Sequence, residues 1–418
     1  MCSLIALFLR AILPLLVSVP LVLALPASAQ ATGTAAARAA NGFGERAPLR
    51  IGVSGPFSGP SAPMGLSMRD GIRIAAAEIN AGGGLLGRRV ELVERDDEAS
   101  NELGAQIVRE FVNRERVVAG LGIVNTGVAL ASQRHYQTAR IPVITSVATG
   151  TLITRQFQPP EFPENYVFRV SANDTLQAEV IVDEAVRRRG FSRLAILHDA
   201  TNYGILGGAD LAATLRAQGI EPVAIERFQL RQTDMRPQLE RARAAGAQAV
   251  LTYGIGPELA HIANSMAHLG WQVPMIGSWT LAMSSFIELA GRNAEGARMP
   301  QTFIAEARTP AQAAFLSAWE RATGSTRIPV PPAAAQGYDS MLLLAAAIRQ
   351  AGSLEGPRIR EALENLDAEV AGVIMRYRRP FSRDNHETLH SARQIHLGEI
   401  RDGTVVFAHE ATPDETGP

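Results

Sequence analysis

Short apolar runs alternate with amphipathic stretches along the chain from Arg50 onward. Residues 51–54 form a short apolar run, which is typical of a buried strand. Apolar positions at helical spacing follow over 68–79, and the glycines at 82–84 predict the end of that helix. The same rhythm predicts strands at 90–93, 117–121 and 142–145, with helices near 103–111 and 128–139 between them. Strands separated by helices run parallel, so we expect a sheet covered by helices on both faces.

A second series of the same kind begins near Phe168. Asp174 is placed to cap a helix that Gly190 ends. Strands are predicted at 194–197, 223–225, 249–252 and 273–276, with helices between them that end at Gly219, Gly246 and Gly270. Two series of about domain size indicate two similar α/β lobes rather than one large sheet.

The chain after Pro300 does not repeat this rhythm. It predicts two strong helices, at 310–322 and 333–351, and a weaker one near 357–366. Residues 371–409 read as strands with little helix. These pieces do not make a third domain of their own, so we expect them to complete the two lobes.

Residues 1–29 form a targeting segment. Arg10 precedes the apolar run 11–25, and Ala27-Ser28-Ala29 has the small residues of a signal-peptide cleavage site, with Gln30 as the first mature residue. The alternative is a membrane anchor, but this run is short against the ~20 residues that span a bilayer. Residues 30–47, rich in Ala, Gly and Thr, are expected to be a flexible leader.

Composition narrows the function classes. The chain has 418 residues, 46% of them apolar and 19% charged, with a formal net charge of −1. These values exclude a disordered polymer, a polytopic membrane protein and a basic nucleic-acid binder. Cleavage of the signal peptide would also remove Cys2, the only cysteine, so an exported protein without disulfides must rely on a large core.

The loops that follow the predicted strands contain mostly Gly, Ser, Thr, Asn and single aromatic residues. They lie at 55–65, 122–127, 146–150, 199–204, 253–257 and 277–283. In open parallel sheets, ligands bind at the carboxyl ends of the strands, where these loops meet. Hydroxyls, backbone groups and aromatic faces suit a small organic ligand, and they offer few titratable groups for acid–base catalysis.

Sequence motifs for nucleotide binding, acid–base catalysis and metal binding are incomplete. Gly120-Leu-Gly122 opens like a dinucleotide-binding fingerprint, but Asn125 stands where the third glycine belongs. Asp96 and Asp97 are neighbours on an extended stretch, so they point to opposite sides, and we expect a helix-entry or surface role for them. His261 and His268 lie two helical turns apart, too far to share a metal. We therefore expect no cofactor and no metal, and an enzyme is only a third hypothesis.

Two stretches resemble a known family. IGVSGPFSGPSAPMG (51–65) and GIRIAAAEINAGGGLLGRRVELVERDD (71–97) look like the opening of the leucine/isoleucine/valine-binding proteins, the type I periplasmic solute receptors of ABC importers. Further matches follow in order at 119–131, 141–150, 167–179, 194–204 and 335–348. Together they extend over nearly all of residues 50–410.

The resemblance implies a fold class: α/β, with two Rossmann-like lobes that have parallel central sheets and a three-crossover hinge. A ligand would be clamped between the lobes by hinge closure. By this analogy lobe 1 comprises 48–169 plus 300–371, and lobe 2 comprises 170–299 plus 372–412. Crossovers would then lie near Pro300 and Gly372.

The resemblance also implies ligand-binding residues in lobe 1. The loop that holds a ligand carboxylate in this family matches Asn125 and Thr126, and its companion loop matches Val147, Ala148 and Thr149. A wall position of the site, often aromatic in amino-acid binders, falls on Met64.

Two further positions are implied in lobe 2. Tyr203 matches a tyrosine that lines the cleft, with a surface tyrosine as the alternative. Trp279 stands where amino-acid binders carry an acidic residue for the ligand ammonium, with simple loop packing as the alternative. A buried ammonium without an anionic partner is costly, so Trp279 favours an apolar or aromatic carboxylate over an α-amino acid. An amide, a short-chain acid and a quaternary amine held by cation–π contact remain alternatives.

We therefore expect a non-enzymatic, periplasmic, monomeric receptor that captures a small organic ligand and delivers it to the membrane permease of an ABC importer. It would bind no nucleic acid. The alternative function is a periplasmic ligand sensor that presents its closed form to a membrane receptor or kinase. The sequence of the receptor does not separate these two functions.

Overall fold

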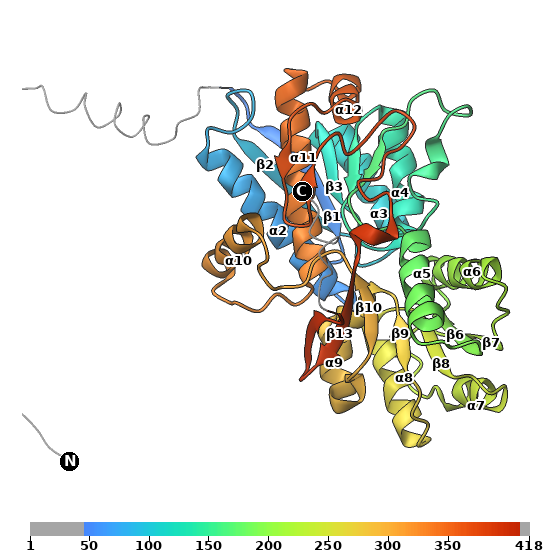
Figure 1. Cartoon of the computed structure of the whole chain (residues 1–418). Coiled ribbons are helices and arrows are strands. Elements are labelled where there is room, and N and C mark those ends of the chain that lie inside the picture. Colours follow the sequence, from blue (N-terminus) through green and yellow to red (C-terminus); the bar gives the residue numbers. More distant parts are fainter. Residues whose placement is uncertain (1–45, 410–418) are drawn as a thin grey trace, which may run out of the picture. The chain divides into compact units, whose positions relative to one another are not determined.

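The computed structural model describes residues 46–409 (Figure 1). The expected signal peptide, and the expected leader up to residue 45, lie outside the described residues. The first sheet has five strands in the order β2-β1-β3-β4-β5, and every neighbouring pair is parallel. Its strands are β1 (Leu49–Gly55), β2 (Val90–Asp96), β3 (Ala119–Gly122), β4 (Val143–Thr145) and β5 (Val167–Arg169).

Helices cover both faces of the first sheet, as the alternating pattern predicts. One face carries α2 (Ala62–Ala81) and α11 (Pro331–Ala351), whose apolar residues share a core with β1. The other face carries α3 (Asn101–Glu110) and α4 (Thr126–Ala139), which pack against each other. A π-helical turn, η1 (Phe111–Glu115), follows α3, and a short 3₁₀ turn, η2 (Arg155–Phe157), precedes β5.

The second sheet has seven strands in the order β14-β13-β10-β9-β8-β6-β7. Its parallel part consists of β6 (Leu194–Asp199), β7 (Ala224–Phe228), β8 (Ala249–Tyr253), β9 (Met275–Gly277) and β10 (Arg298–Gln301). Two antiparallel strands from the end of the chain, β13 (His396–Arg401) and β14 (Thr404–Phe407), extend it beside β10. The two sheets with their helices are two Rossmann-like lobes, which confirms the expected fold class.

Alternate residues of β6 serve the two faces of the second sheet. Leu194 and Ile196 join the core that includes α5 and α6, whereas Ala195 and Leu197 join the core that includes α7, α8 and α9. This is the period of two that a strand buried on both faces requires. The helices are α5 (Asp174–Val182), α6 (Asn202–Ala217), α7 (Arg236–Ala244), α8 (Gly256–His268) and α9 (Ser284–Ala290), with turns η3 (Asp183–Arg188), η4 (Trp279–Ala282) and η5 (Gly291–Ala294).

The chain passes between the lobes three times: after β5, after β10 and before β13. After β10 it returns to the first lobe as α10 (Pro310–Thr323), α11 and α12 (Gly356–Glu364), close to the helices expected there. Figure 1 shows α11, in orange, lying beside α2, in blue, and the two helices pack closely. A Cβ atom at Gly71 would lie 2.1 Å from the Ala334 carbonyl oxygen, so this contact requires glycine.

The last stretch bonds to the first lobe before it rejoins the second. Strands β11 (Val370–Ala371) and β12 (Arg376–Tyr377) pair with each other, and the Asp339 carboxylate of α11 accepts the N–H groups of Val373 and Ile374. The backbone N–H of Arg169 in β5 donates to the carbonyl of His386. The 3₁₀ turn η6 (Ala392–Gln394) then leads into β13. Residues 373–388 therefore lie beside the first lobe, and the expected lobe boundaries stay a prediction.

The α5 helix begins differently from the expectation. Its N-cap is Asn173, whose side chain accepts the Leu176 N–H at 2.9 Å, so the expectation that Asp174 caps this helix is wrong. Asp174 is instead the first helical residue and is fully buried. The Asp174 carboxylate accepts the Tyr253 hydroxyl in the core, so it is not available to cap the helix.

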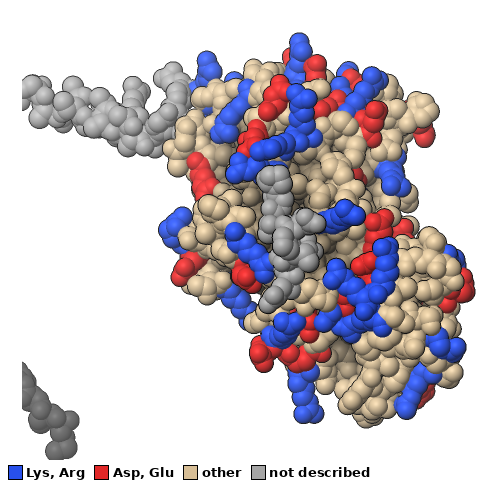
Figure 2. Space-filling model, in the orientation of Figure 1, with Lys and Arg blue, Asp and Glu red and all other residues tan. Residues whose placement is uncertain are grey.

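Charged side chains of both signs lie side by side on the face shown in Figure 2. Among residues 46–409 many charged side chains are paired, for example Arg73 with Glu94 and Arg216 with Glu221, each at 2.6 Å. Within residues 46–409, no helix is long and apolar enough to span a membrane.

Candidate ligand-binding site

A small cavity lies where loops of the two lobes meet. Its walls consist of Met64, Val124, Asn125, Thr126, Thr149, Tyr203, Ile255, Trp279 and Thr280. Six of the eight residues implied by the family resemblance are among them. The cavity volume is about 20 Å³, which is room for about one water molecule. A larger ligand therefore requires the walls to move apart. That these residues bind the ligand stays a prediction.

Val147 and Ala148 do not line this cavity. Both side chains are buried in the cores of the first lobe. The Ala148 N–H donates to the Ile123 carbonyl at 3.1 Å, and its carbonyl accepts the Ser171 hydroxyl at 2.9 Å. These two residues thus anchor the loop that presents Thr149, and their own side chains face the core.

The start of α4 forms one wall of the cavity. Asn125 is the N-cap of this helix, but its side chain makes no capping hydrogen bond. Asn125 Nδ2 donates to Ser61 Oγ at 3.3 Å, while Asn125 Oδ1 is buried without a partner in the described structure. Free N–H groups and the helix dipole make such a helix start favourable for an anion.

The turn into α4 depends on Gly122. Its φ of +116° lies outside the range that L side chains adopt readily, and an added Cβ would lie 2.2 Å from the Ser54 carbonyl oxygen. Ile123 follows with a φ of +62°, which is strained for a β-branched residue. Strain of this kind concentrates at sites whose geometry the rest of the fold holds in place.

Thr126 and Thr149 belong to two loops that are held together. The Thr126 hydroxyl accepts the Gly150 N–H at 3.3 Å, and a Cβ on Gly150 would lie 2.4 Å from Thr126 Cγ2. The buried Arg169 guanidinium donates to the Gly150 carbonyl at 2.7 Å and binds the Glu387 carboxylate at 2.8 Å. Arg169 therefore links the loop of Thr149 to the last chain segment.

Trp279 lies between two amide side chains of the second lobe. Its backbone N–H donates to Gln177 Oε1 at 3.2 Å, and its carbonyl accepts Gln301 Nε2 at 3.2 Å. The indole is 7% exposed, and its Nε1–H has no partner in the described residues. The backbone of Trp279 is thus fixed while its indole N–H is available to a ligand.

A buried acid lies behind the cavity. Tyr253 donates its hydroxyl to Asp174 Oδ1 at 2.7 Å, and the Tyr253 ring lies 4.9 Å from the Tyr203 ring. Burial raises the pKa of Asp174 to about 7, although hydrogen bonds from Thr149 and Tyr253 oppose that shift. Burial likewise raises the pKa of Tyr203 well above its usual value. The sequence predicted only a capping role for Asp174, although the residue falls in the matched stretch 167–179.

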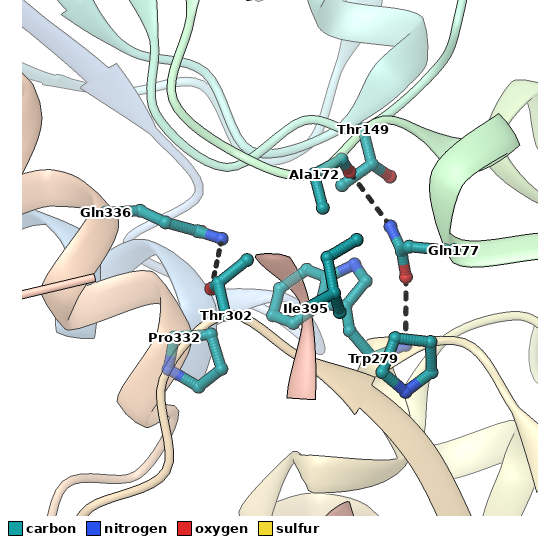
Figure 3. Close-up of a pocket in the computed structure, with 9 residues that line it drawn as sticks. Thr149, Ala172, Gln177, Trp279, Thr302, Pro332, Gln336 and Ile395 are labelled. Carbon is teal, nitrogen blue, oxygen red and sulfur yellow. Dashed lines mark hydrogen bonds between the residues drawn. The ribbon is translucent and has the colours of Figure 1, made fainter. Parts of the chain in front are cut away.

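A second cavity adjoins the first and shares Thr149 and Trp279 with it (Figure 3). Its remaining walls are Ala172, Gln177, Pro300, Thr302, Pro332, Gln336 and Ile395. Its volume is about 10 Å³. The sequence did not predict these residues. Pro300 lies in β10 and Thr302 directly after it, Gln177 lies on α5, and Gln336 lies on α11.

The other sequence candidates do not join this site. Asp97 is fully buried, and burial raises its pKa to about 7, so the surface alternative for it is wrong. It lies at the entry to α3, where its carboxylate accepts the Ala99 N–H at 3.0 Å, as the helix-entry alternative predicts. Asp96 accepts the Phe57 N–H at 2.8 Å. In the part of the chain that the structure describes, no group of three or more His, Cys, Asp or Glu side chains is arranged to hold a metal ion.

Comparison with known proteins identifies the family. Residues 48–403 match the periplasmic binding protein family. The chain is 27% identical over 310 residues to a Leu/Ile/Val-binding protein homolog of Brucella melitensis, covering 74% of this chain and 81% of the relative. It is 25% identical over 318 residues to a leucine-, isoleucine-, valine-, threonine- and alanine-binding protein of Pseudomonas aeruginosa, covering 75% and 82%.

Solved structures agree on the fold. A leucine-binding protein of Thermotoga maritima superposes with a TM-score of 0.76 at 23% identity, covering 88% of this chain and 99% of that one. A solute-binding protein of an ABC transporter from R. palustris, in complex with 4-hydroxybenzoate, superposes with a TM-score of 0.76 at 20% identity, covering 87% and 96%.

The fold and the site define a periplasmic solute-binding protein, and the chain belongs to the leucine/isoleucine/valine-binding family of type I periplasmic binding proteins. Its relatives are binding proteins rather than enzymes. Family membership implies an extracytoplasmic location, a small ligand and a transporter permease as partner.

Proposed function

We propose that this protein captures an apolar or aromatic carboxylate, rather than an α-amino acid, and delivers it to the permease of an ABC importer. The observation that carries the proposal is the lining of the first cavity. There an uncapped helix start meets neutral polar and apolar side chains.

The carboxylate is assigned to the start of α4. Asn125 and Thr126 form this end of the cavity, and no side chain of the N-cap satisfies the helix N–H groups. The Thr149 hydroxyl lies on the facing loop. Hydrogen bonds from helix N–H groups and the positive end of the helix dipole stabilise an anion without a buried cation.

The lining of the first cavity offers no anionic partner for the ammonium group of an α-amino acid. None of the nine residues that line the first cavity is charged. Asp174 lies behind Thr149, where its Oδ1 already accepts the Tyr253 hydroxyl and its raised pKa favours the neutral form. Trp279 and Met64 instead offer an aromatic face and a soft apolar contact.

The similar proteins bind ligands of two classes, amino acids and aromatic acids. The Brucella and Pseudomonas proteins are named as binders of branched-chain and related amino acids, whereas the R. palustris protein holds 4-hydroxybenzoate in the same fold. A neutral cavity with Trp279 at the ammonium position favours the second class for this chain.

The proposal also covers how the protein acts on its ligand and where it acts. The protein performs no chemistry on its ligand, acts as a monomer in the periplasm and is exported by its cleavable N-terminal segment. A ligand that binds the closed form preferentially shifts the population toward that form, which the permease then recognises. A sensor would use the same closure, and a neighbouring gene for a permease or for a membrane kinase would distinguish the two functions.

Thermal-shift screening of the mature chain, residues 30–418, tests the ligand class. The panel contains α-amino acids, aromatic acids, dicarboxylates, amides and polyamines. At a ligand concentration of 100 times Kd we expect stabilisation by about 2.7 kcal/mol for an aromatic or apolar acid. A strong shift with leucine and none with aromatic acids would contradict the proposal.

A further inference from the structure

The two cavities are separated by shared walls. Thr149 and Trp279 line both of them, and the second cavity continues toward Gln336 of α11 and Ile395 before β13. Figure 3 shows Gln177 and the Gln336–Thr302 pair on opposite sides of this second cavity. Each cavity alone is about the size of one or two water molecules, with volumes of about 20 and 10 Å³. Displacement of the Trp279 indole would join them into one elongated site.

Hydrogen bonds hold the backbone of Trp279 but not its indole N–H. Gln177 and Gln301 hold the backbone N–H and carbonyl of Trp279, each at 3.2 Å. The indole N–H has no partner among residues 46–409 that would resist a change of rotamer.

One residue in the wall of the second cavity has an unused hydrogen-bond acceptor. Gln336 is 3% exposed, and its Nε2 donates to Thr302 Oγ1 at 3.1 Å. Its Oε1 is buried and has no partner among the described residues. An unpaired buried acceptor is costly, because it has lost its hydration without gaining a hydrogen bond. A ligand donor placed there would offset this cost.

We infer that the second cavity is a subsite for a hydrogen-bonding group at the far end of the ligand. The ligand class is a carboxylic acid whose distal end carries a hydroxyl or an amide. A hydroxyl has the donor that Gln336 Oε1 lacks and the acceptor that Trp279 Nε1–H lacks. The inference rests on the proposed carboxylate site at α4, and it adds that Gln336 and Trp279 determine which acids are preferred.

The test compares benzoate with 4-hydroxybenzoate, which differ only by the distal hydroxyl. Isothermal titration of the mature wild-type protein should give at least tenfold tighter binding of 4-hydroxybenzoate, which is about 1.4 kcal/mol. Gln336→Leu removes the amide and should reduce this preference to less than about threefold, because 4-hydroxybenzoate loses a hydrogen bond that benzoate never makes. If Gln336→Leu does not fold, judged by its melting curve, Gln336→Met serves the same purpose.

Gln238→Leu is the matched control. Gln238 is also a buried glutamine with an unpartnered Oε1, but it lies on α7 and lines neither cavity. This variant should keep the wild-type preference. Equal affinities of the wild type for the two acids would overturn the subsite but not the carboxylate site. An equal loss of affinity for both acids in Gln336→Leu would have the same meaning. If neither acid binds, the proposed ligand class fails and the subsite fails with it.

Discussion

The hydroxyl of Tyr253 donates a 2.7 Å hydrogen bond to Asp174 Oδ1, and both side chains are fully buried behind the candidate ligand site. Asp174 Oδ2 has no hydrogen bond of ordinary geometry in the described residues. Arg169 and Asp210 are the other charged groups that act on this carboxyl. The second lobe thus places an acid next to Thr149 and Tyr203, where its protonation state affects stability directly.

Stability should fall as the pH rises from 5 to 8. Burial raises the pKa of Asp174 from 3.8 to about 7, so the folded state favours the protonated carboxyl. The stability from this protonation is complete below pH 3.8 and is lost as the pH rises through about 7. Asp97 and Asp339 have pKa values raised to about 7 for the same reason. We therefore expect melting temperatures to decrease over this range.

Asp174→Asn isolates the contribution of this residue. An amide oxygen still accepts the Tyr253 hydroxyl, but the side chain no longer ionises, so the change in melting temperature between pH 5 and pH 8 should be smaller. Asp367→Asn, at an exposed carboxylate paired with Arg379, should retain the wild-type dependence. An unchanged pH dependence in Asp174→Asn would show that Asp174 does not titrate in this range.

Trp279→Phe should weaken ligand binding at least tenfold, because it removes the indole N–H and part of the wall that both cavities share. Truncation in Trp279→Ala should weaken binding further and also lower stability, by about 3–5 kcal/mol for a buried tryptophan. Titration of the ligand found by screening measures the first effect and denaturant unfolding the second. Trp319→Phe is the control, since this buried tryptophan of α10 also has an unpartnered Nε1 but lines neither cavity. Equal affinities of Trp279→Phe and wild type would remove Trp279 from the site.

A hydrogen bond between the lobes should slow ligand release. The Thr151 hydroxyl, in the turn after β4, donates to Asp210 Oδ2 of α6 at 2.9 Å. Thr151→Val removes about 1 kcal/mol of net hydrogen-bond energy from this contact between the lobes. We expect about fivefold faster dissociation in stopped-flow fluorescence, with little change in the association rate. Thr214→Val, which loses a bond inside α6 to the Asp210 carbonyl, should leave dissociation unaffected. If both variants release the ligand equally fast, the contact does not hold the lobes together.

The close packing of α2 on α11 should not tolerate a methyl group. A Cβ at Gly71 would lie 2.1 Å from the Ala334 carbonyl oxygen, and one at Gly337 would lie 2.2 Å from the Met68 carbonyl oxygen. Gly71→Ala and Gly337→Ala should each destabilise the protein by about 1–3 kcal/mol in denaturant unfolding. Gly82→Ala is the control, because its nearest neighbour would be 3.5 Å away and its φ is −80°. Loss of stability in the control alone would refute this reading of the interface.

The periodic parts of the fold could be predicted from the sequence. The helices expected at 310–322 and 333–351 are Pro310–Thr323 and Pro331–Ala351 in the structure. Such segments carry their signal locally, since one buried face imposes a period of 3.6 residues. Local sequence could not show that Asp174 is not the helix cap, because its carboxylate is occupied by Tyr253 of the distant strand β8.

The site was predictable only where a family motif marked it. Met64, Thr149 and Trp279 were proposed by resemblance, and the structure places them around one cavity. Val147 and Ala148 belong to the same motif, yet their side chains are buried. Successive residues of an extended segment point to opposite sides, and here each side is a hydrophobic core. Gln336 falls in the matched stretch 335–348, near the start of the apolar helix α11, but the match assigned it no role, so nothing local distinguished it from a core position.

The sequence by itself determined the alternation of strands and helices, the two-lobed fold class and the family. Hydrophobic periodicity and short ordered motifs are local properties of the chain. Only the tertiary structure decided that the return segment brings Gln336 and Thr302 next to Trp279, and that Asp174 is buried under Tyr253. The reason is that these contacts join residues far apart in the chain, and they depend on how helices and sheets pack rather than on any pattern within them.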